Sequence, residues 1–244
     1  MRTPRIHLPG PLAVGDEVTL PEAAARHLGR VLRLGPGAAL RLFDGRGGEY
    51  AATLSTVEKR RVSARIEAFE PREVELPFRV VLAQAVSRGD RMDLTLQKAV
   101  ELGVGAIVPL VTARSAPLPA GERLERRVAH WRGIVASACE QCGRNRLPGV
   151  LPPTRLGTWL PEAPAGTRLM LDPDAGSSLR QAPLARGDVT LLVGPEGGLD
   201  SKELAQAEGA GFVGIGLGPR VLRTETAALA ALAQLQLLHP ETDQ

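Results

Sequence analysis

Two short apolar segments of the chain each end in a loop with almost no side-chain bulk. Residues 189–193 (VTLLV) precede GPEGG, and residues 212–217 (FVGIGL) precede GPRVLRTET. Apolar, β-branched runs bounded by glycine are typical of buried strands. We expect both strands in one parallel sheet, because α/β proteins hold their ligands beyond the carboxyl ends of such strands. The sequence therefore predicts an α/β fold with residues 194–198 (the first glycine loop) and 218–226 (the second glycine loop) at one sheet edge.

Each glycine loop is expected to lead into a helix. Ser201 is the expected N-cap of the helix after the first loop, and a long Ala/Leu helix is expected to start near Thr224 or Thr226 and run to Leu238. Free backbone amides and the positive end of that helix would attract a polar ligand. A P-loop is excluded because no Gly-Lys-Ser/Thr occurs, and residues 214–218 (GIGLG) lack the dinucleotide-binding spacing. Ordinary turn glycines are the alternative interpretation.

The pattern of strands and helices divides the chain near residue 72. Before it we expect short strands at residues 17–20, 39–43, 49–55 and 62–69, and one helix from 21 to about 32. Prolines and charges at residues 70–77 indicate a linker. Beyond it we expect strands at 78–86, 106–111 and 168–171, helices at 92–102 and 122–141, and an irregular stretch at 151–165. The predicted domains are residues 1–72 and 73–244.

Positive charge is concentrated in the first domain. Residues 1–72 hold 12 Lys and Arg against 8 Asp and Glu, whereas residues 73–244 hold 18 against 19. On the predicted helix, Arg26, Arg30 and Arg33 follow an i, i+4, i+7 spacing, with His27 beside them. Arginines on one helix face can track nucleic-acid phosphates, and a merely solvated face is the alternative. The uneven charge points to nucleic acid as a partner.

The two cysteines form a Cys139-Glu-Gln-Cys142 motif late in a helical pattern. Redox cysteines of this spacing usually lie at a helix start, and no histidine spacing suggests a metal, so we expect small core residues and no metal. No run of eighteen apolar residues occurs, and the N-terminal residues lack the apolar core of a signal peptide. A cytoplasmic protein is expected.

GPEGG together with LGPRVLRTETA resembles the signature of the SPOUT methyltransferases, in particular the bacterial 16S ribosomal RNA uracil-N3 methyltransferase (RsmE) family. The resemblance extends over nearly the whole chain. It implies a C-terminal SPOUT α/β domain with a deep trefoil knot within about residues 168–238. It also implies a small N-terminal PUA-like β-barrel that binds RNA, S-adenosylmethionine as cofactor, and a homodimer.

The activity implied by this resemblance is methylation of N3 of one uridine, the uridine-1498 equivalent, in 16S ribosomal RNA of the small ribosomal subunit. Two other functions stay open. One is a SPOUT methyltransferase acting on another RNA, such as a transfer-RNA ribose. The other is a non-catalytic RNA-binding factor of ribosome assembly that kept the fold.

The candidate site residues fall into three groups. The uridine N3 proton must leave before methylation, so we expect Arg223 to stabilise the uridine anion and Glu225 to act as base. Glu196 is expected to meet ribose hydroxyls or the positive tail of the cofactor, or to orient Arg220. The full set of expected cofactor-binding residues is Leu171, Val193, Gly194, Pro195, Glu196, Gly197, Gly198, Leu217, Gly218, Arg220, Val221, Leu222, Thr224 and Thr226. The expected RNA-binding residues are Arg26, His27, Arg30, Arg33, Arg88, Lys98, Arg114, Gln141 and Arg144.

Overall fold

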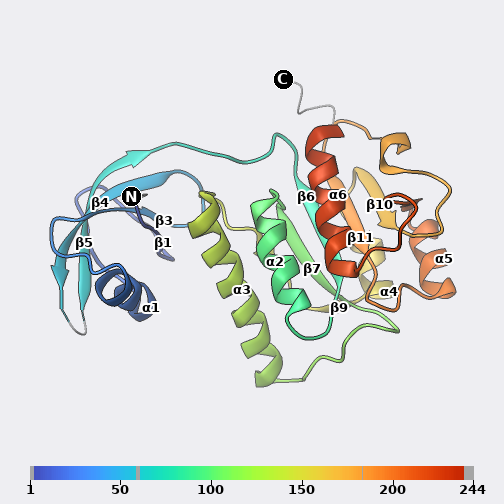
Figure 1. Ribbon diagram of the computed structural model, residues 1–244, viewed down its shortest axis with the longest axis horizontal. Helices are drawn as coiled ribbons and strands as arrows, with labels where there is room; N and C mark the ends of the chain where they lie inside the picture. The colour runs from blue at the N-terminus through green and yellow to red at the C-terminus, as the bar shows by residue number, and fades with distance from the viewer. Residues whose placement is uncertain (1–2, 59–60, 183, 239–244) are drawn as a thin grey trace. The chain divides into compact units, whose positions relative to one another are not determined.

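The computed structural model describes residues 3–58, 61–182 and 184–238, and the chain forms two compact units (Figure 1). The N-terminal unit comprises Met1–Glu75 and Ala136–Leu147, and the C-terminal unit comprises Leu76–Val135 and Pro148–Gln244. Both units mix helices with sheets, and the expected α/β class is confirmed for the C-terminal unit.

The division of the chain differs from the predicted boundary at residue 72 in one respect. We expected all of residues 73–244 in the second domain, but Ala136–Leu147 belongs to the N-terminal unit. Buried polar contacts hold this segment there. The guanidinium of Arg144 bonds both carboxylate oxygens of Glu75, and the Asn145 amide donates to the Arg72 carbonyl at 2.6 Å. Local sequence pattern did not reveal these contacts, because the partners lie about seventy residues apart, at separations of 69 and 73.

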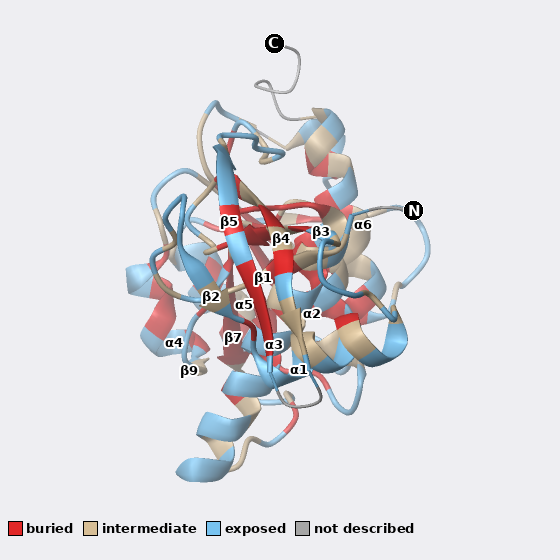
Figure 2. Cartoon of the chain, turned by 90° about the vertical axis from the view of Figure 1, so that its left-hand side faces the viewer, coloured by how far each residue is buried: buried red, intermediate tan, exposed pale blue. Residues whose placement is uncertain are grey.

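The N-terminal unit is built on a five-stranded sheet in the order β1-β3-β4-β5-β2. The β1 and β3 strands pair in parallel, and the other neighbours are antiparallel. Buried and exposed residues alternate along part of β5, as expected for a sheet with one face on the core (Figure 2). The elements are β1 (Arg5–His7), β2 (Glu17–Thr19), α1 (Glu22–Arg26), a π-helical turn η1 (His27–Val31), β3 (Ala39–Phe43), β4 (Glu49–Val57) and β5 (Val62–Glu70).

Two features of this unit differ from the predictions. The strand β1 was not predicted, and Arg5 on it pairs with the buried carboxylate of Glu49 rather than adding free charge at the chain start. The predicted helix from residue 21 to 32 changes at His27 into a wider turn, in which the Leu32 amide donates to the His27 carbonyl at 3.0 Å. Arg33 then follows the helix in a left-handed conformation, with φ of 53°. Arg26, Arg30 and Arg33 therefore do not share one regular α-helical face, although all three are exposed.

The C-terminal unit contains a parallel sheet in the order β12-β10-β11-β6-β7-β8, with β9 also paired to β7. Its elements are β6 (Val80–Ala85), α2 (Arg91–Glu101), β7 (Ala106–Val111), α3 (Glu122–Cys142, whose last turns belong to the other unit), β8 (Gly149–Val150), β9 (Thr154–Arg155), α4 (Leu156–Trp159), a 3-10 turn η2 (Leu160–Glu162), β10 (Thr167–Leu171), a 3-10 turn η3 (Leu179–Gln181), β11 (Val189–Val193), α5 (Ser201–Gly209), β12 (Val213–Ile215) and α6 (Thr224–Leu238).

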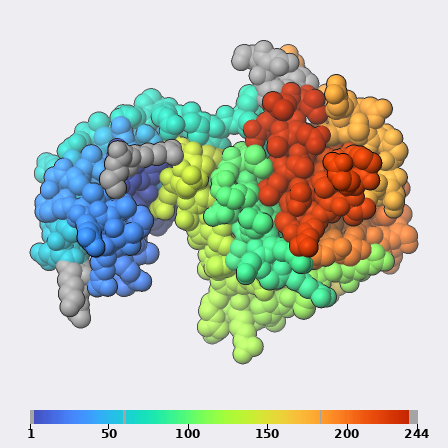
Figure 3. Space-filling view, in the orientation of Figure 1, coloured from blue at the N-terminus to red at the C-terminus, as the bar shows by residue number. Residues whose placement is uncertain are grey.

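Helices cover both faces of this sheet, which explains why β6 and β11 are buried along their whole length and are mostly apolar. On one face α2 and α6 lie side by side, as Figures 1 and 3 both show, and the Gln236 amide donates to the Leu102 carbonyl at 2.7 Å. On the other face Trp159 of α4 and Ala207 of α5 belong to one buried cluster with Val81 and Leu192. The carboxyl edge of the sheet is thereby held between two rigid layers.

Several local predictions need correction. Asp200, not Ser201, caps α5, since its carboxylate accepts from the Glu203 amide at 2.8 Å while the Glu203 side chain bonds back to the Asp200 amide. The stretch 151–165 is not irregular, because β9, α4 and η2 lie within it. The strand predicted at 212–217 is shorter, at Val213–Ile215. The knot expected within residues 168–238 depends on chain threading and stays a prediction.

Of the two cysteines expected in the core, Cys139 is buried and Cys142 is partly exposed. Cys139 is fully buried, and this burial raises the pKa of its thiol to about 12. The thiolate is the form that attacks a disulfide reagent, so we expect Cys142 alone to react with such a reagent in the native protein at mildly alkaline pH. Counting released thiolate before and after denaturation tests this, with Cys142→Ser as the control that should react only when unfolded. Equal rates for both cysteines in the native protein would contradict it.

Among the described residues, no helix combines the length and apolar character needed to cross a membrane.

Candidate active site

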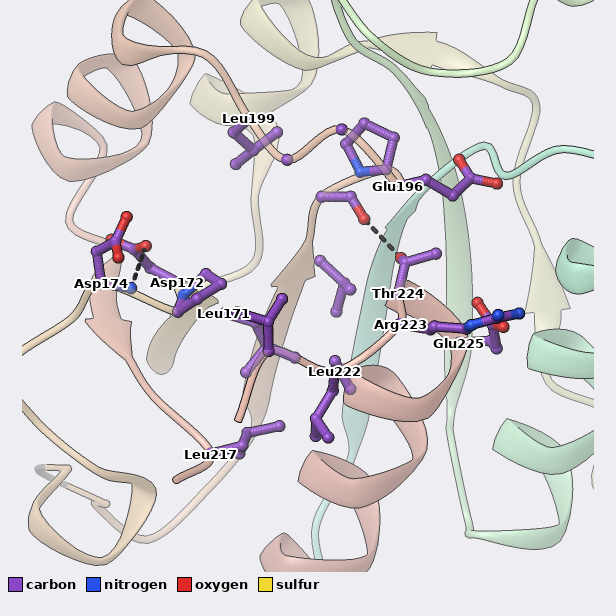
Figure 4. Close-up of a pocket in the computed structure, with 18 of the residues that line it drawn as sticks. Leu171, Asp172, Asp174, Glu196, Leu199, Leu217, Leu222, Arg223, Thr224 and Glu225 are labelled. Atoms are coloured by element: carbon purple, nitrogen blue, oxygen red, sulfur yellow. Dashed lines mark hydrogen bonds between the residues drawn. The ribbon is translucent and has the colours of Figure 1, made fainter. Parts of the chain in front are cut away.

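A cavity of about 700 Å³ opens at the carboxyl ends of β10, β11 and β12, between the two glycine loops (Figure 4). This is the sheet edge at which the sequence predicted a ligand site, and the volume is typical of small-molecule pockets. Its lining residues are Arg91, Arg114, Leu171, Asp172, Pro173, Asp174, Val193, Gly194, Pro195, Glu196, Gly197, Gly198, Leu199, Leu204, Ile215, Leu217, Gly218, Arg220, Val221, Leu222, Arg223, Thr224, Glu225 and Ala227.

Glycine is required at specific points of both loops. Gly198 has φ of +70° and Gly218 has φ of +109°, which L-residues with side chains rarely adopt. At Gly194 an added Cβ would lie 3.2 Å from the Leu199 amide nitrogen, closer than ordinary packing allows. The loops therefore bend tightly and present backbone, rather than side chains, to the cavity.

A buried hydrogen-bond chain joins the first glycine loop to the start of α6. The Thr224 hydroxyl donates to the Gly194 carbonyl at 2.6 Å and accepts from the Gln84 amide at 3.0 Å (Figure 4). Thr226 was also expected to bind the cofactor, but it is exposed and does not line the cavity. Two residues along a helix correspond to a rotation of about 200°, so Thr226 points away when Thr224 points inward.

Glu196 of the first glycine loop is held by the turn before α2. Its carboxylate accepts from the Arg88 amide and from Arg91 Nη1, both at 2.9 Å. Partial burial pushes the pKa of Glu196 upward, but the hydrogen bonds from the Arg88 and Glu196 amides and from Arg91 outweigh it, and the pKa lies below its ordinary value. The expected role of orienting Arg220 is not seen, since Arg91 makes this contact.

The lowered pKa of Glu196 predicts a pH-dependent contribution to stability. A carboxylate with a depressed folded pKa stabilises the fold above its unfolded value, here the ordinary 4.5, and loses this contribution as pH falls through the folded pKa. We expect Glu196→Gln to lower Tm at neutral pH and to match the wild type in strong acid. Melting curves of both proteins from neutral pH down to about 3 test this. A difference in Tm between the two proteins that grows as the pH falls below 4.5 would contradict this prediction.

The two expected catalytic residues both line the cavity, on its side near α2. Glu225 is 7% exposed, with Oε1 lying 3.8 Å from Arg91 Nε, and its Oε2 is buried without a hydrogen-bond partner in the described structure. Arg223 is exposed and lies beside Glu225 in Figure 4. The two expected catalytic side chains therefore lie at the same wall of the cavity, Glu225 as a buried carboxylate and Arg223 as an exposed cation.

The remaining walls differ in chemistry. Leu171, Leu217 and Leu222 gather at one end, whereas Asp172 and Asp174 lie at another side (Figure 4). An apolar end suits a planar ring, and carboxylates suit hydroxyl groups or positive charge. Such a cavity can hold a molecule that carries an aromatic base, a polar sugar and a cationic group.

Four polar residues of this site were absent from the predicted set, as were the apolar lining residues Pro173, Leu199, Leu204, Ile215 and Ala227. Arg91, Asp172 and Asp174 line the cavity, and the Gln84 side chain donates a hydrogen bond to the Thr224 hydroxyl. A signal existed for each: Gln84 is the single polar residue in the strand VVLAQA, and the other three follow strand ends. Polar side chains at those positions lie at the ligand-binding edge of a parallel sheet.

The expected RNA-binding residues fall into different environments. Arg88 and Arg114 are exposed near the cavity, and Lys98 pairs with Glu101 at 2.8 Å. Arg144 is 4% exposed and bonded to Glu75, so the structure contradicts its expected exposure to RNA. Those on the surface of the N-terminal unit are Arg26, His27, Arg30, Arg33 and Gln141.

Within the described ranges, no three His, Cys, Asp or Glu side chains are grouped so as to hold a metal ion.

Comparison with known proteins identifies the family. Residues 74–236 match the RNA methyltransferase domain family, and residues 20–67 match the RNA methyltransferase PUA domain family. Ribosomal RNA small subunit methyltransferase E of Buchnera aphidicola subsp. Schizaphis graminum is 30% identical over 97% of this chain and 96% of its own length. The Synechocystis protein of the same name is 35% identical over 91% of this chain and 73% of its own length.

Solved structures agree over the full length. Ribosomal RNA small subunit methyltransferase E from Neisseria gonorrhoeae, bound to S-adenosylmethionine, is 43% identical with a TM-score of 0.91, covering 98% of both chains. A Legionella pneumophila protein with the bound cofactor SAM is 40% identical with a TM-score of 0.93, covering 97% of this chain and 98% of its own. The PUA-like N-terminal unit and the family predicted from the glycine loops are confirmed. The chain belongs to the ribosomal RNA small subunit methyltransferase E family.

Proposed function

We propose that this protein uses S-adenosylmethionine to methylate N3 of one uridine, the uridine-1498 equivalent, in 16S ribosomal RNA of the small ribosomal subunit. The observation that carries the proposal is the cavity between the two glycine loops, in a chain whose full-length relatives bear the name of this enzyme. No second function is favoured by any feature of the cavity.

The residues present fit S-adenosylmethionine. The cavity of about 700 Å³ is large enough, its leucine end suits adenine, and the backbone near Leu217 and Leu222 can bond the edge of that base. Glu196, Asp172 and Asp174 offer oxygens for ribose hydroxyls and for the ammonium group of the tail. When bound, this cofactor supplies a methyl group on a positively charged sulfur. The Oε2 of Glu225, which is buried without a hydrogen-bond partner in the described structure, is left for the RNA base.

The chain supplies the proton chemistry through two groups. Glu225 is placed to accept the N3 proton of uridine through its unpaired Oε2, while Oε1 stays near Arg91. Loss of that proton leaves negative charge on the base, which the guanidinium of Arg223 stabilises. Arg91 acts as a positioning residue, because it joins Glu196 of the first glycine loop to Glu225 of α6.

RNA is held outside the cavity by the exposed basic residues. Arg26, His27, Arg30 and Arg33 belong to the N-terminal unit, which carries the net positive charge of the chain. We further propose a cytoplasmic homodimer. Leu237 at the end of the apolar α6 is 80% exposed, which supports a contact with a second copy there.

A methylation assay on small ribosomal subunits tests the proposed function. Subunits from a strain without this protein should gain one methyl group, and mass mapping should place it on N3 of a single 16S uridine. Methyl transfer to transfer RNA but not to subunits would favour the tRNA enzyme. Binding of subunits without any transfer would favour an assembly factor.

A further inference from the structure

A second cavity, of about 480 Å³, adjoins the first at the first glycine loop. Arg88, Arg91, Arg114, Glu196 and Gly197 line it, and all of these except Arg88 also line the first cavity. The two cavities therefore adjoin at Arg91, Arg114 and the first glycine loop, and three of the five residues that line the second one are arginines.

The charges of this second cavity do not cancel. Arg91 is neutralised by Glu196, to which it bonds at 2.9 Å. Arg114 Nη1 donates to the neutral carbonyl of Gly197 at 2.8 Å, which leaves its positive charge uncompensated. The Arg88 guanidinium has no bonded partner among the described residues. Two positive charges therefore remain for an anion, with one carboxylate already paired.

The scaffold fixes the two available arginines. Arg88 follows β6, and its own amide is anchored on the Glu196 carboxylate. Arg114 lies in a turn held at both sides, because the Ala113 amide donates to buried Glu203 at 2.7 Å and the Thr112 amide donates to the Ser115 hydroxyl at 3.1 Å. Anchored turns present their side chains at reproducible positions, which is a requirement of a binding site.

We propose that this second cavity is a phosphate subsite, in which Arg88 and Arg114 bind a backbone phosphodiester of the RNA strand whose target base enters the first cavity. The inference rests on the proposed function. Guanidinium groups bind phosphate oxygens through paired, charge-assisted hydrogen bonds, and a base in one cavity requires its own backbone to pass over the adjoining rim. Arg91 remains paired with Glu196, so it helps to position the loop but does not provide an unpaired positive charge for the phosphate.

The salt dependence of RNA binding tests this subsite. The dissociation constant for small subunits from a strain without the enzyme is measured at several KCl concentrations for wild type, Arg88→Gln, Arg114→Gln and the double variant. The logarithm of the association constant falls linearly with the logarithm of the salt concentration, and each lost phosphate contact is expected to make this line less steep by about 0.7–0.9. Between roughly 50 and 200 mM KCl, the affinity of the wild type should therefore fall about threefold more than that of each single variant. S-adenosylmethionine affinity should stay unchanged in Arg88→Gln, because Arg88 does not line the first cavity.

Arg186→Gln is the matched control, because Arg186 is exposed in the same unit but precedes the amino end of β11, at the opposite sheet edge. Its slope should equal that of the wild type. If the wild type methylates subunits but Arg88→Gln and Arg114→Gln show the wild-type salt dependence, the phosphate subsite is overturned and the proposed function is not. Weakened S-adenosylmethionine binding with an unchanged slope would instead assign the arginines to the cofactor carboxylate and also overturn it. A wild-type protein that methylates no subunits would refute the proposed function itself.

Discussion

Arg223→Ala is expected to lower kcat for uridine methylation by about 10²–10³-fold, the usual effect of removing one preorganised group that stabilises developing negative charge. Arg223 lies on the second glycine loop directly before α6, lines the cavity and is exposed toward the incoming base. The uridine anion exists only after N3 loses its proton, so the guanidinium stabilises the transition state more than the bound substrate. The loss should therefore appear in kcat rather than in the affinity for either substrate.

Single-turnover rates with saturating subunits and cofactor measure this effect. Arg223→Lys should recover part of the rate, because lysine restores the positive charge but lacks the planar guanidinium with its paired N–H donors. Arg186→Ala, which removes an exposed arginine at the other edge of the same sheet, should retain the wild-type rate. Full turnover of Arg223→Ala with unchanged cofactor binding would reject the role.

Glu225→Gln is expected to reduce kcat by about 10²–10⁴-fold, the range that a positioned general base contributes. The amide has nearly the same shape as the carboxylate but cannot take up the N3 proton. Glu225 is suited to this role because it is 7% exposed, its Oε1 faces Arg91 at 3.8 Å, and its Oε2 has no hydrogen-bond partner in the described structure. Thr224, the preceding residue, is fixed by Gln84 and Gly194, so the carboxylate is held in place.

The effect of Glu225→Gln must be separated from loss of structure. Calorimetric affinity for S-adenosylmethionine and the Tm should change little, since the helix and the Thr224 hydrogen bonds persist. Glu101→Gln is the matched control, because this exposed carboxylate lies at the end of α2 and bonds only Lys98 among the described residues. Wild-type kcat in Glu225→Gln would show that another group removes the proton.

Local pattern was sufficient for the elements that build the cavity. The strands Ala106–Val111 and Val189–Val193 match their predicted bounds, because each is a compact, mostly apolar run closed by a turn residue. The cavity lining followed from the same pattern, since the carboxyl ends of parallel strands meet at one edge. Of the predicted cofactor residues, Thr226 alone lies outside the lining.

Features that depend on distant contacts were not predicted. The burial of Arg144 required Glu75, and that of Arg5 required Glu49, whereas an arginine in sequence normally indicates a solvated surface. Arg91 lies at a helix start, where an acidic residue is the usual preference, and its role appeared only when Glu196 and Glu225 were placed beside it. The N-cap of α5 is Asp200 rather than the predicted Ser201, because Asp200 and Glu203 exchange hydrogen bonds between side chain and backbone.

A crystal structure of the full chain with S-adenosylmethionine tests the central claim most directly. We predict one cofactor molecule per chain between the two glycine loops, with its base toward Leu171, Leu217 and Leu222 and its cationic groups toward the carboxylates of the cavity. An empty cavity at saturating cofactor, or the cofactor bound elsewhere on the chain, would contradict the account.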